Sequence, residues 1–149
     1  MPTVFFLNGP NANLYGLDAE EAYGREDFPA IGARCHRAAE RAGLLLDFRQ
    51  TNDEGQLIDW VQEARAAADG LLINATSLSC TSIAVMDAML MLDCPVIEVH
   101  LSNIHRREPF RGKTFTSLAA TASLCGLGPL CYELAIGAMA DLIAAGSRR

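Results

Sequence analysis

The sequence of 149 residues lacks several features that would place it in a common class of protein. It has no excess of basic residues: 12 lysines and arginines face 18 acidic residues, for a net charge of −6. Because phosphate binding needs a basic face, we expect no nucleic-acid partner. No apolar run approaches the roughly 20 residues of a membrane span, so we expect no membrane association. No charged segment precedes an apolar one at the amino terminus, and no signal peptide is predicted.

Recognisable cofactor and metal motifs are also missing. The five cysteines are odd in number and show no CxxC spacing, which favours reduced thiols in a cytoplasmic protein. No GxGxxG motif follows the first predicted strand, which argues against a dinucleotide site, and no cofactor is expected. A metal site built from Cys80, Glu98, His100 and His105 stays open as an alternative, although no tight ligand spacing supports it.

Short apolar runs alternate with longer helical patterns along the chain. The predicted strands cover residues 3–7, 44–50, 70–74, 96–100 and 121–124. The predicted helices cover residues 27–42, 56–68, 79–92 and 130–145, with Asp27 as a cap before the first and Gly43 just after its end. This alternation predicts one domain over residues 1–149: a doubly wound α/β fold whose parallel sheet of about five strands is covered on both faces.

Polar residues interrupt the predicted strand at 96–100. Glu98 and His100 are two residues apart, with Ser102 just beyond, so their side chains share one face of an extended chain. A carboxylate beside an imidazole orients the ring, fixes its tautomer and favours its protonated form. Three arginines follow, where an anionic ligand could be held: Arg106, Arg107 and Arg111. The pattern indicates the edge of an active site, and a structural polar pair is the alternative.

Polar groups end the other predicted strands as well. They are Asn8-Gly9-Pro10-Asn11, Arg49-Gln50-Thr51-Asn52, Asn74 and His100-Leu101-Ser102-Asn103. Each alone is compatible with ordinary turn chemistry. Ligands in open α/β sheets bind beyond the carboxyl ends of the strands, so the four together predict a binding site at that edge.

Several further motifs occur in order along the chain. They are Tyr23-Gly24, Glu54-Gly55, Thr81-Ser82 with Asp87-Ala88, Glu98-Val99-His100, Arg107-Glu108 with Phe110-Arg111, and Gly126-Leu127-Gly128 with Tyr132. Together with the strand ends they resemble the type II 3-dehydroquinate dehydratases over essentially the whole chain. The resemblance implies a flavodoxin-like fold, no metal or cofactor, and a homo-oligomer, a dodecamer of four trimers.

The resemblance also implies a reaction on a small cyclic hydroxy-carboxylate. Such enzymes remove water from 3-dehydroquinate by anti elimination through an enolate, giving 3-dehydroshikimate. The reaction serves the shikimate pathway of aromatic amino acid biosynthesis or quinate catabolism, and the sequence leaves both open.

Five residues match the family's catalytic positions. Tyr23, on a lid loop at about 14–26, matches the tyrosine whose phenolate takes the C2 proton, and Arg107 matches its positive neighbour. His100 matches the acid that protonates the departing hydroxyl, and Glu98 matches the carboxylate that supports it. Asn11 matches the amide holding a water that stabilises the enolate.

Other residues match substrate contacts of the family. Asn74, Leu101 and Ser102 match a carboxylate pocket, to which Leu101 and Ser102 contribute backbone groups. Arg111 matches a contact to a substrate hydroxyl. Asp87 matches a residue that reaches in from the adjoining subunit.

The chain departs from the family pattern at the lid and in the pocket. Asp18 stands where the family has a lid arginine, and a nearby negative charge disfavours a phenolate. Arg25 could replace the missing charge. Cys80 occupies the position of a substrate-binding histidine, and Met86 that of a usual arginine. A non-catalytic or diverged paralogue that binds a related cyclic hydroxy-carboxylate is therefore the alternative to an active dehydratase.

Overall fold

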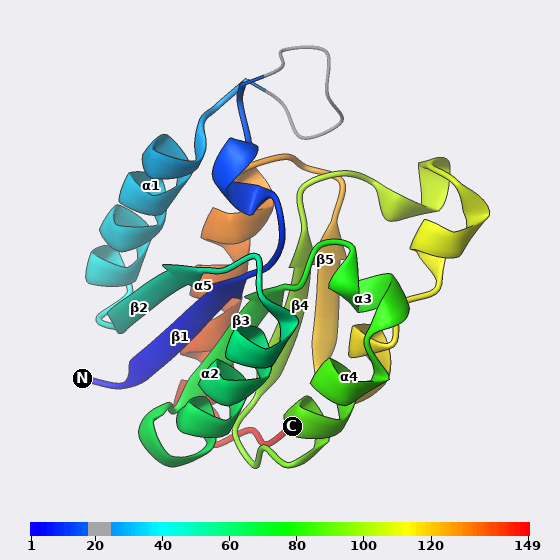
Figure 1. Ribbon diagram of the computed structural model, residues 1–149. Coiled ribbons are helices and arrows are strands. Elements are labelled where there is room, and N and C mark those ends of the chain that lie inside the picture. The colour runs from blue at the N-terminus through cyan, green and yellow to red at the C-terminus, as the bar shows by residue number, and fades with distance from the viewer. Residues whose placement is uncertain (18–24) are drawn as a thin grey trace.

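A parallel sheet organises the residues that this computed structural model describes, 1–17 and 25–149 (Figure 1). Within that part of the chain the sheet has five strands in the order β2-β1-β3-β4-β5. The strands are β1 Thr3–Asn8, β2 Leu45–Gln50, β3 Gly70–Asn74, β4 Val96–His100 and β5 Ala122–Cys125. This order is flavodoxin-like, and the expected doubly wound parallel sheet is confirmed. The chain changes direction across the sheet between β1 and β3, the usual place for a ligand.

The register of the strands brings their polar ends together. Asn8 of β1 pairs with Asn74 of β3, so two buried amides end neighbouring strands at one level. On the next strand Glu98 pairs with Ile73, which places His100 beyond that level. The carboxyl ends therefore form one edge, as the sequence predicted.

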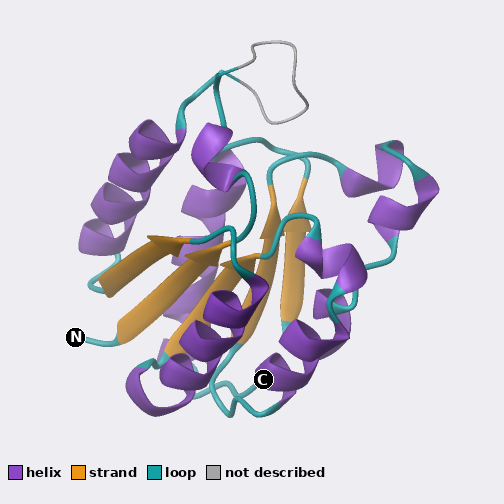
Figure 2. Cartoon of the chain, viewed as in Figure 1, coloured by secondary structure: helices purple, strands orange, loops and turns teal. Residues whose placement is uncertain are grey.

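Helices cover both faces of the sheet (Figure 2). They are α1 Phe28–Arg41, α2 Glu54–Ala67, α3 Leu78–Thr81, α4 Ile83–Leu90 and α5 Leu130–Ala144. Helices α1 and α5 bury one face, which includes Phe6 and Ile97. Helices α2 and α4 bury the other, which includes Leu7 and Ile73. Burial on both sides explains why the central strands β1 and β3 are nearly continuous apolar runs.

The predicted helix at 79–92 was wrong, because the structure divides it in two. Ser82 between α3 and α4 is extended, with φ −101° and ψ 98°. Its Oγ accepts a hydrogen bond from Val85 N at 2.9 Å and so begins a new helix as an N-cap. The first short helix, which carries Cys80, thereby follows the end of β3.

Caps were predicted more reliably than short helices. Asp27 Oδ1 accepts from Ala30 N at 2.9 Å, and Gly43 follows α1 with φ 72°, a left-handed conformation that suits glycine.

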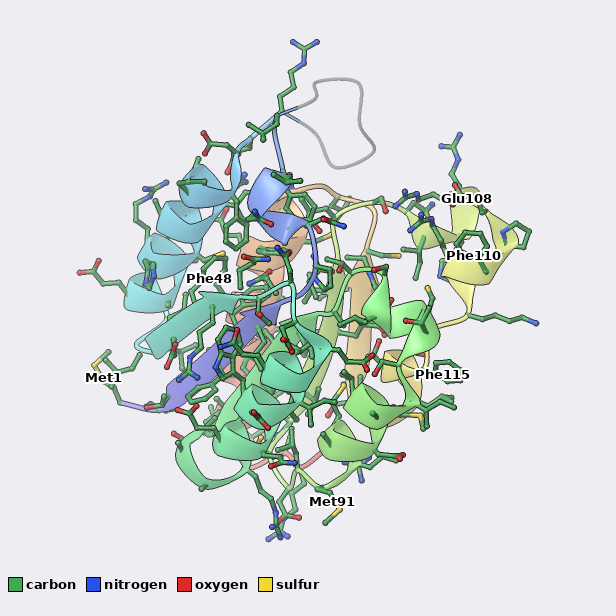
Figure 3. All side chains as sticks on the ribbon, viewed as in Figure 1. Met1, Phe48, Met91, Glu108, Phe110 and Phe115 are labelled. Atoms are coloured by element: carbon green, nitrogen blue, oxygen red, sulfur yellow. The ribbon has the colours of Figure 1, made fainter. Side chains whose placement is uncertain are left out.

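Four 3-10 helices within the described residues were not anticipated: η1 Ala12–Leu14, η2 Ile104–Arg106, η3 Pro109–Gly112 and η4 Thr116–Ala119. Figure 3 shows Glu108 and Phe110 at the outer end of the segment that carries η2 and η3. No helix in the described ranges is long and apolar enough to cross a membrane.

Candidate active site

The polar pair on β4 lies inside the protein. Glu98 and His100 are 1% and 6% exposed. His100 Nε2 lies 3.4 Å from Glu98 Oε2, within ion-pair distance. Residues two apart on a strand share a face, which explains why the sequence could predict this contact.

Glu98 is held as a carboxylate by groups from the neighbouring elements. Thr116, which begins η4, donates its hydroxyl to Oε2, and Ser123 of β5 donates to Oε1 at 3.0 Å. Burial alone would raise the pKa of Glu98, but His100 and the hydroxyls of Thr116 and Thr114 outweigh it, so the pKa lies below the ordinary value. A full negative charge therefore stands beside the imidazole at neutral pH.

His100 is the member of the pair whose hydrogen bonding is incomplete. Its Nε2 is buried yet has no hydrogen-bond partner among the described residues, although Glu98 Oε2 lies 3.4 Å away. Buried polar atoms without partners are rare in native proteins, and each asks for an explanation. Here His100 also lines a pocket, so a functional role is the simplest one.

The pocket encloses about 340 Å³, including the solvent at its mouth, beyond the ends of β3 and β4. It gathers most of the predicted site residues from separate elements. Those that line it are Asn74, Cys80, His100, Leu101, Ser102, Arg107 and Arg111. The structure therefore brings these seven positions together around one pocket.

Two arginines give the pocket positive charge. Arg107 directly follows η2 and donates from Nη1 to Ser102 Oγ at 3.2 Å. Arg111 belongs to η3, where its guanidinium pairs with Glu108 and lies 5.2 Å from the centre of the Phe110 ring. Arginine forms strong, directional hydrogen bonds to carboxylates. The pocket therefore suits a small anion.

Asn11 lies at the side of this pocket, in a neighbouring opening that Tyr15 and Arg111 also line. Its φ of 69° is left-handed, a conformation that asparagine tolerates, and its backbone N–H donates to Asn52 Oδ1 at 3.0 Å. Gly9 lets the segments that follow β1 and β3 pass close together, because a Cβ there would lie 2.4 Å from the Ala75 carbonyl oxygen.

Other predicted residues lie elsewhere. Asp87 is exposed on α4 and does not line the pocket of its own chain. Arg25 is exposed. Tyr23 and Asp18 lie outside the described residues. Of the loop expected at about 14–26, residues 18–24 are likewise outside them.

The end of β2 and the segment that follows it were overestimated as part of the binding edge. Arg49 pairs with Asp47 and Glu63 instead of lining the pocket. Asn52 contributes only indirectly, by holding Asn11. The metal alternative also finds no support, because no three His, Cys, Asp or Glu side chains are grouped to hold an ion in the described ranges.

Some pocket residues were not found from the sequence. Tyr15, Thr76, Ser79 and Ile104 line the pocket, and their positions depend on the unpredicted η1, α3 and η2 turns. The only available signal was their closeness in sequence to the predicted strand ends.

Comparisons with known proteins agree with this geometry. The family model described as dehydroquinase class II matches residues 2–140. A 3-dehydroquinate dehydratase from Caulobacter sp. (strain K31) is 50% identical over 142 residues, 95% of this chain and 97% of that protein. The 3-dehydroquinate dehydratase 2 of Pseudomonas aeruginosa is 45% identical over 139 residues, 93% of this chain and 94% of that protein. The crystal structure of a type II dehydroquinase from Propionibacterium acnes is 32% identical, with a TM-score of 0.86 over 95% of this chain and 99% of that one.

Proposed function

Because this chain belongs to the class II dehydroquinase family, we propose that it is a hydro-lyase that converts 3-dehydroquinate to 3-dehydroshikimate. The observation that carries the proposal is the buried Glu98–His100 pair at a pocket lined by Arg107 and Arg111. A proton donor supported by a carboxylate and a cationic pocket for an anion are what the elimination of water from a hydroxy-carboxylate needs.

The base in this reaction is Tyr23, whose phenolate removes the C2 proton of the substrate. The electrons of the broken C–H bond move toward the ketone, giving an enolate. A water held by the Asn11 amide donates a hydrogen bond to the enolate oxygen, a place where charge develops. Arg107 supplies positive charge to the base, and its position in the pocket supports that role.

The acid is His100. When the enolate collapses, the C–O bond to the departing hydroxyl breaks and His100 gives it a proton, so that water leaves. Glu98 stabilises the imidazolium form, because its carboxylate lies 3.4 Å from Nε2 and its low pKa keeps it charged. The substrate carboxylate binds at Asn74 and at the backbone of Leu101 and Ser102, with Arg111 on a hydroxyl.

A homo-oligomer built from trimers, in total a dodecamer, is part of the proposal. Asp87 is exposed on α4 with Ile83 and Leu90, which are 53% and 40% exposed and lie at helical spacing with it. An apolar face beside an acidic residue suits contact with another copy, which would bring Asp87 to a neighbour's site. Light scattering should give a mass well above the 16.0 kDa monomer. A stable monomer would remove Asp87 from the site.

A cytoplasmic location and a role in aromatic biosynthesis or quinate catabolism belong to the same proposal. All five cysteines are free thiols in the structure, as expected in a reducing compartment. The choice between the two pathways depends on which enzymes accompany this one in the cell.

The altered lid bears on the rate. Asp18 stands where the family has an arginine, five positions before the proposed base in the sequence, and Cys80 lines the pocket where the family has histidine. We therefore expect Asp18→Arg to raise turnover of 3-dehydroquinate and to move the pH–rate profile toward lower pH. If Asp18→Arg gives no gain and the wild type is slow, the diverged paralogue with a related substrate becomes the better assignment.

The direct experiment is to mix the purified protein with 3-dehydroquinate and follow the rise in ultraviolet absorbance, because the product is a conjugated enone. We expect a rise that depends on the protein concentration and is lost in His100→Ala. Absence of any rise with folded protein would overturn the proposed function.

A further inference from the structure

Thr76 has a strained backbone at the edge of the pocket. Within residues 1–17 and 25–149, positive φ angles outside glycine occur at Asn11, with 69°, and at Thr76, with 53°. Asparagine tolerates this left-handed conformation, but for a β-branched residue such as threonine it is a genuine outlier. Such strain persists only where the surrounding structure enforces it, and it gathers at functional sites. The strained backbone of Thr76 therefore asks for a reason.

Hydrogen bonds hold Thr76 in this conformation from both ends. Its backbone N–H donates to Asn74 Oδ1 at 3.1 Å, and its carbonyl oxygen accepts from Ser79 N at 3.1 Å and from Ser79 Oγ at 2.6 Å. Both partners are 1% exposed. Asn74 is itself fixed, because its Nδ2 donates at 2.7 Å to the hydroxyl of Tyr132, which donates at 2.6 Å to Asn8 Oδ1. The turn that leads from β3 into α3 is therefore anchored in the core.

The hydroxyl of Thr76 joins two segments that are distant in the sequence. Its Oγ1 donates to the carbonyl oxygen of Pro10 at 2.8 Å, from the segment after β3 to the segment after β1. The Ala75 carbonyl oxygen is equally near, at 2.8 Å, but it already accepts from the backbone N–H of Leu78 at 3.1 Å. The single hydroxyl proton is therefore better used at Pro10. Glycine would make the same turn without strain but could not make this contact.

Pro10 directly precedes Asn11, the residue proposed to hold the enolate water. Asn11 is exposed, so its position depends on its backbone more than on packing around the side chain. Its N–H donates to Asn52 Oδ1 at 3.0 Å, beyond the end of β2, and Thr76 holds the other side through Pro10. Thr76 and Asn11 also line the same opening beside the pocket. The segment that carries Asn11 is thus held between the segments that follow β2 and β3.

From these contacts we infer that Thr76 is a positioning residue, whose hydroxyl holds the Pro10 backbone and so places the Asn11 amide for the enolate water. The inference rests on the proposed function, in which Asn11 has that role. It also gives the strain a reason, because a small displacement of a group that stabilises developing charge lowers the rate strongly. Thr76 acts on the reaction only through Asn11.

The test compares three substitutions of Thr76. Thr76→Val keeps the branched shape and loses the hydroxyl, Thr76→Ser keeps the hydroxyl, and Thr76→Gly loses the hydroxyl and relieves the strain. We expect kcat for 3-dehydroquinate to fall about 10- to 100-fold in the valine and glycine variants, with KM within about threefold, because a lost oxyanion donor costs roughly 10²- to 10³-fold. Thr76→Ser should stay within about threefold of the wild type, because it retains the hydrogen bond. Full kcat in Thr76→Gly would overturn the inference.

A matched control lies at the opposite end of the sheet. Thr121 directly precedes β5, and its Oγ1 accepts from Val96 N at 3.0 Å. Thr121→Val should lower the melting temperature through the loss of this hydrogen bond and keep kcat within about twofold. A fall in kcat equal to that of Thr76→Val would assign both effects to a general loss of stability and overturn the inference.

A double-mutant cycle tests whether Thr76 acts through Asn11. In an Asn11→Ala background, which removes the amide, Thr76→Val should lower kcat by less than about twofold, because residues that act as a unit are not additive. A further loss of about 10-fold or more would show that the two residues act independently and would overturn the inference.

Hydrogen exchange separates this inference from the proposed function. Peptides that cover residues 9–14 should exchange faster in Thr76→Val and Thr76→Gly than in the wild type and Thr76→Ser, whether or not the protein is active. A wild type that shows this pattern but does not turn over 3-dehydroquinate would overturn the function and retain the hold of Thr76 on the Asn11 segment. Unchanged exchange in the variants would overturn the inference even in an active enzyme.

Discussion

Two charged groups at strand ends make an instructive contrast. The β2 cluster consists of Arg49 with Asp47 and Glu63, and it is complete. Arg49 donates to both carboxylates over distances of 2.7 to 2.9 Å, and its guanidinium lies 4.6 Å from the centre of the Phe5 ring and 5.4 Å from that of Trp60. The hydrogen bond from Arg49 lowers the pKa of each carboxyl below its ordinary value.

The β4 pair, Glu98 and His100, is incomplete by comparison. Hydroxyl groups satisfy the carboxylate, but the buried His100 Nε2 is left without a hydrogen bond from the described residues. Both groups combine a carboxylate and a base at the carboxyl end of a strand. The difference teaches that a charge satisfied by its own protein serves the fold, whereas a buried polar atom left unsatisfied beside a pocket is the candidate for the proposed chemistry.

The largest expected effect is on the β4 pair. His100→Ala should lower turnover of 3-dehydroquinate by about two to four orders of magnitude, because general acid catalysis contributes that much. Steady-state kinetics and circular dichroism would be measured together. Near-normal turnover by a folded variant would rule out the proposed role of His100. The β4 pair would then differ from the β2 cluster only in its hydrogen bonding.

Glu98→Gln should produce the next effect, on both stability and its pH dependence. We expect a loss of about 1–3 kcal/mol in the free energy of unfolding at pH 7, because the buried imidazole loses its charged neighbour. The folded pKa of Glu98 is lowered, so its stabilisation is present above the unfolded value of about 4.3 and is lost as pH falls through the folded pKa. Urea unfolding of wild type and variant should therefore converge in acid. A constant gap down to pH 3 would contradict this.

Arg49→Met is the matched change in the β2 cluster. It should lower the free energy of unfolding by about 1–2 kcal/mol, through the loss of partly exposed ion pairs and cation–π contacts, and leave turnover within about twofold. The same urea and absorbance measurements apply. A hundredfold loss of turnover here would erase the distinction between the two groups.

The smallest effect concerns the reactivity of two cysteines, Cys35 in the core and Cys80 in the pocket. Burial raises the pKa of Cys35 to about 12, and so we expect iodoacetamide at pH 8 to leave Cys35 unmodified in the native protein. Cys80 lines the pocket and should be modified, more slowly when 3-dehydroshikimate is bound. Peptide mass spectrometry would measure both. Labelling of Cys35 ahead of Cys80 would contradict the burial argument.

The sequence predicted the sheet and the β4 pair because both depend on short-range periodicity. Alternation along one strand was enough to place Glu98 beside His100. The same polar pattern at the end of β2 could not reveal that Arg49 is satisfied by Glu63, 14 residues away in the chain. Likewise, the division of the predicted helix at Ser82 and the position of Tyr15 in the pocket lining depend on local turns. The side-chain partners of these turns become visible only in three dimensions.

The hydrogen bond between Tyr132 and Asn8 joins residues 124 positions apart in the chain. A contact of such high sequence separation forms late, because loop closure must be achieved before it contributes stability. Until α5 docks on the sheet, Asn74 lacks one of the acceptors that orient its side chain, and this part of the pocket lining is not fixed. Recovery of activity during refolding should therefore lag behind the formation of secondary structure and report the docking of α5.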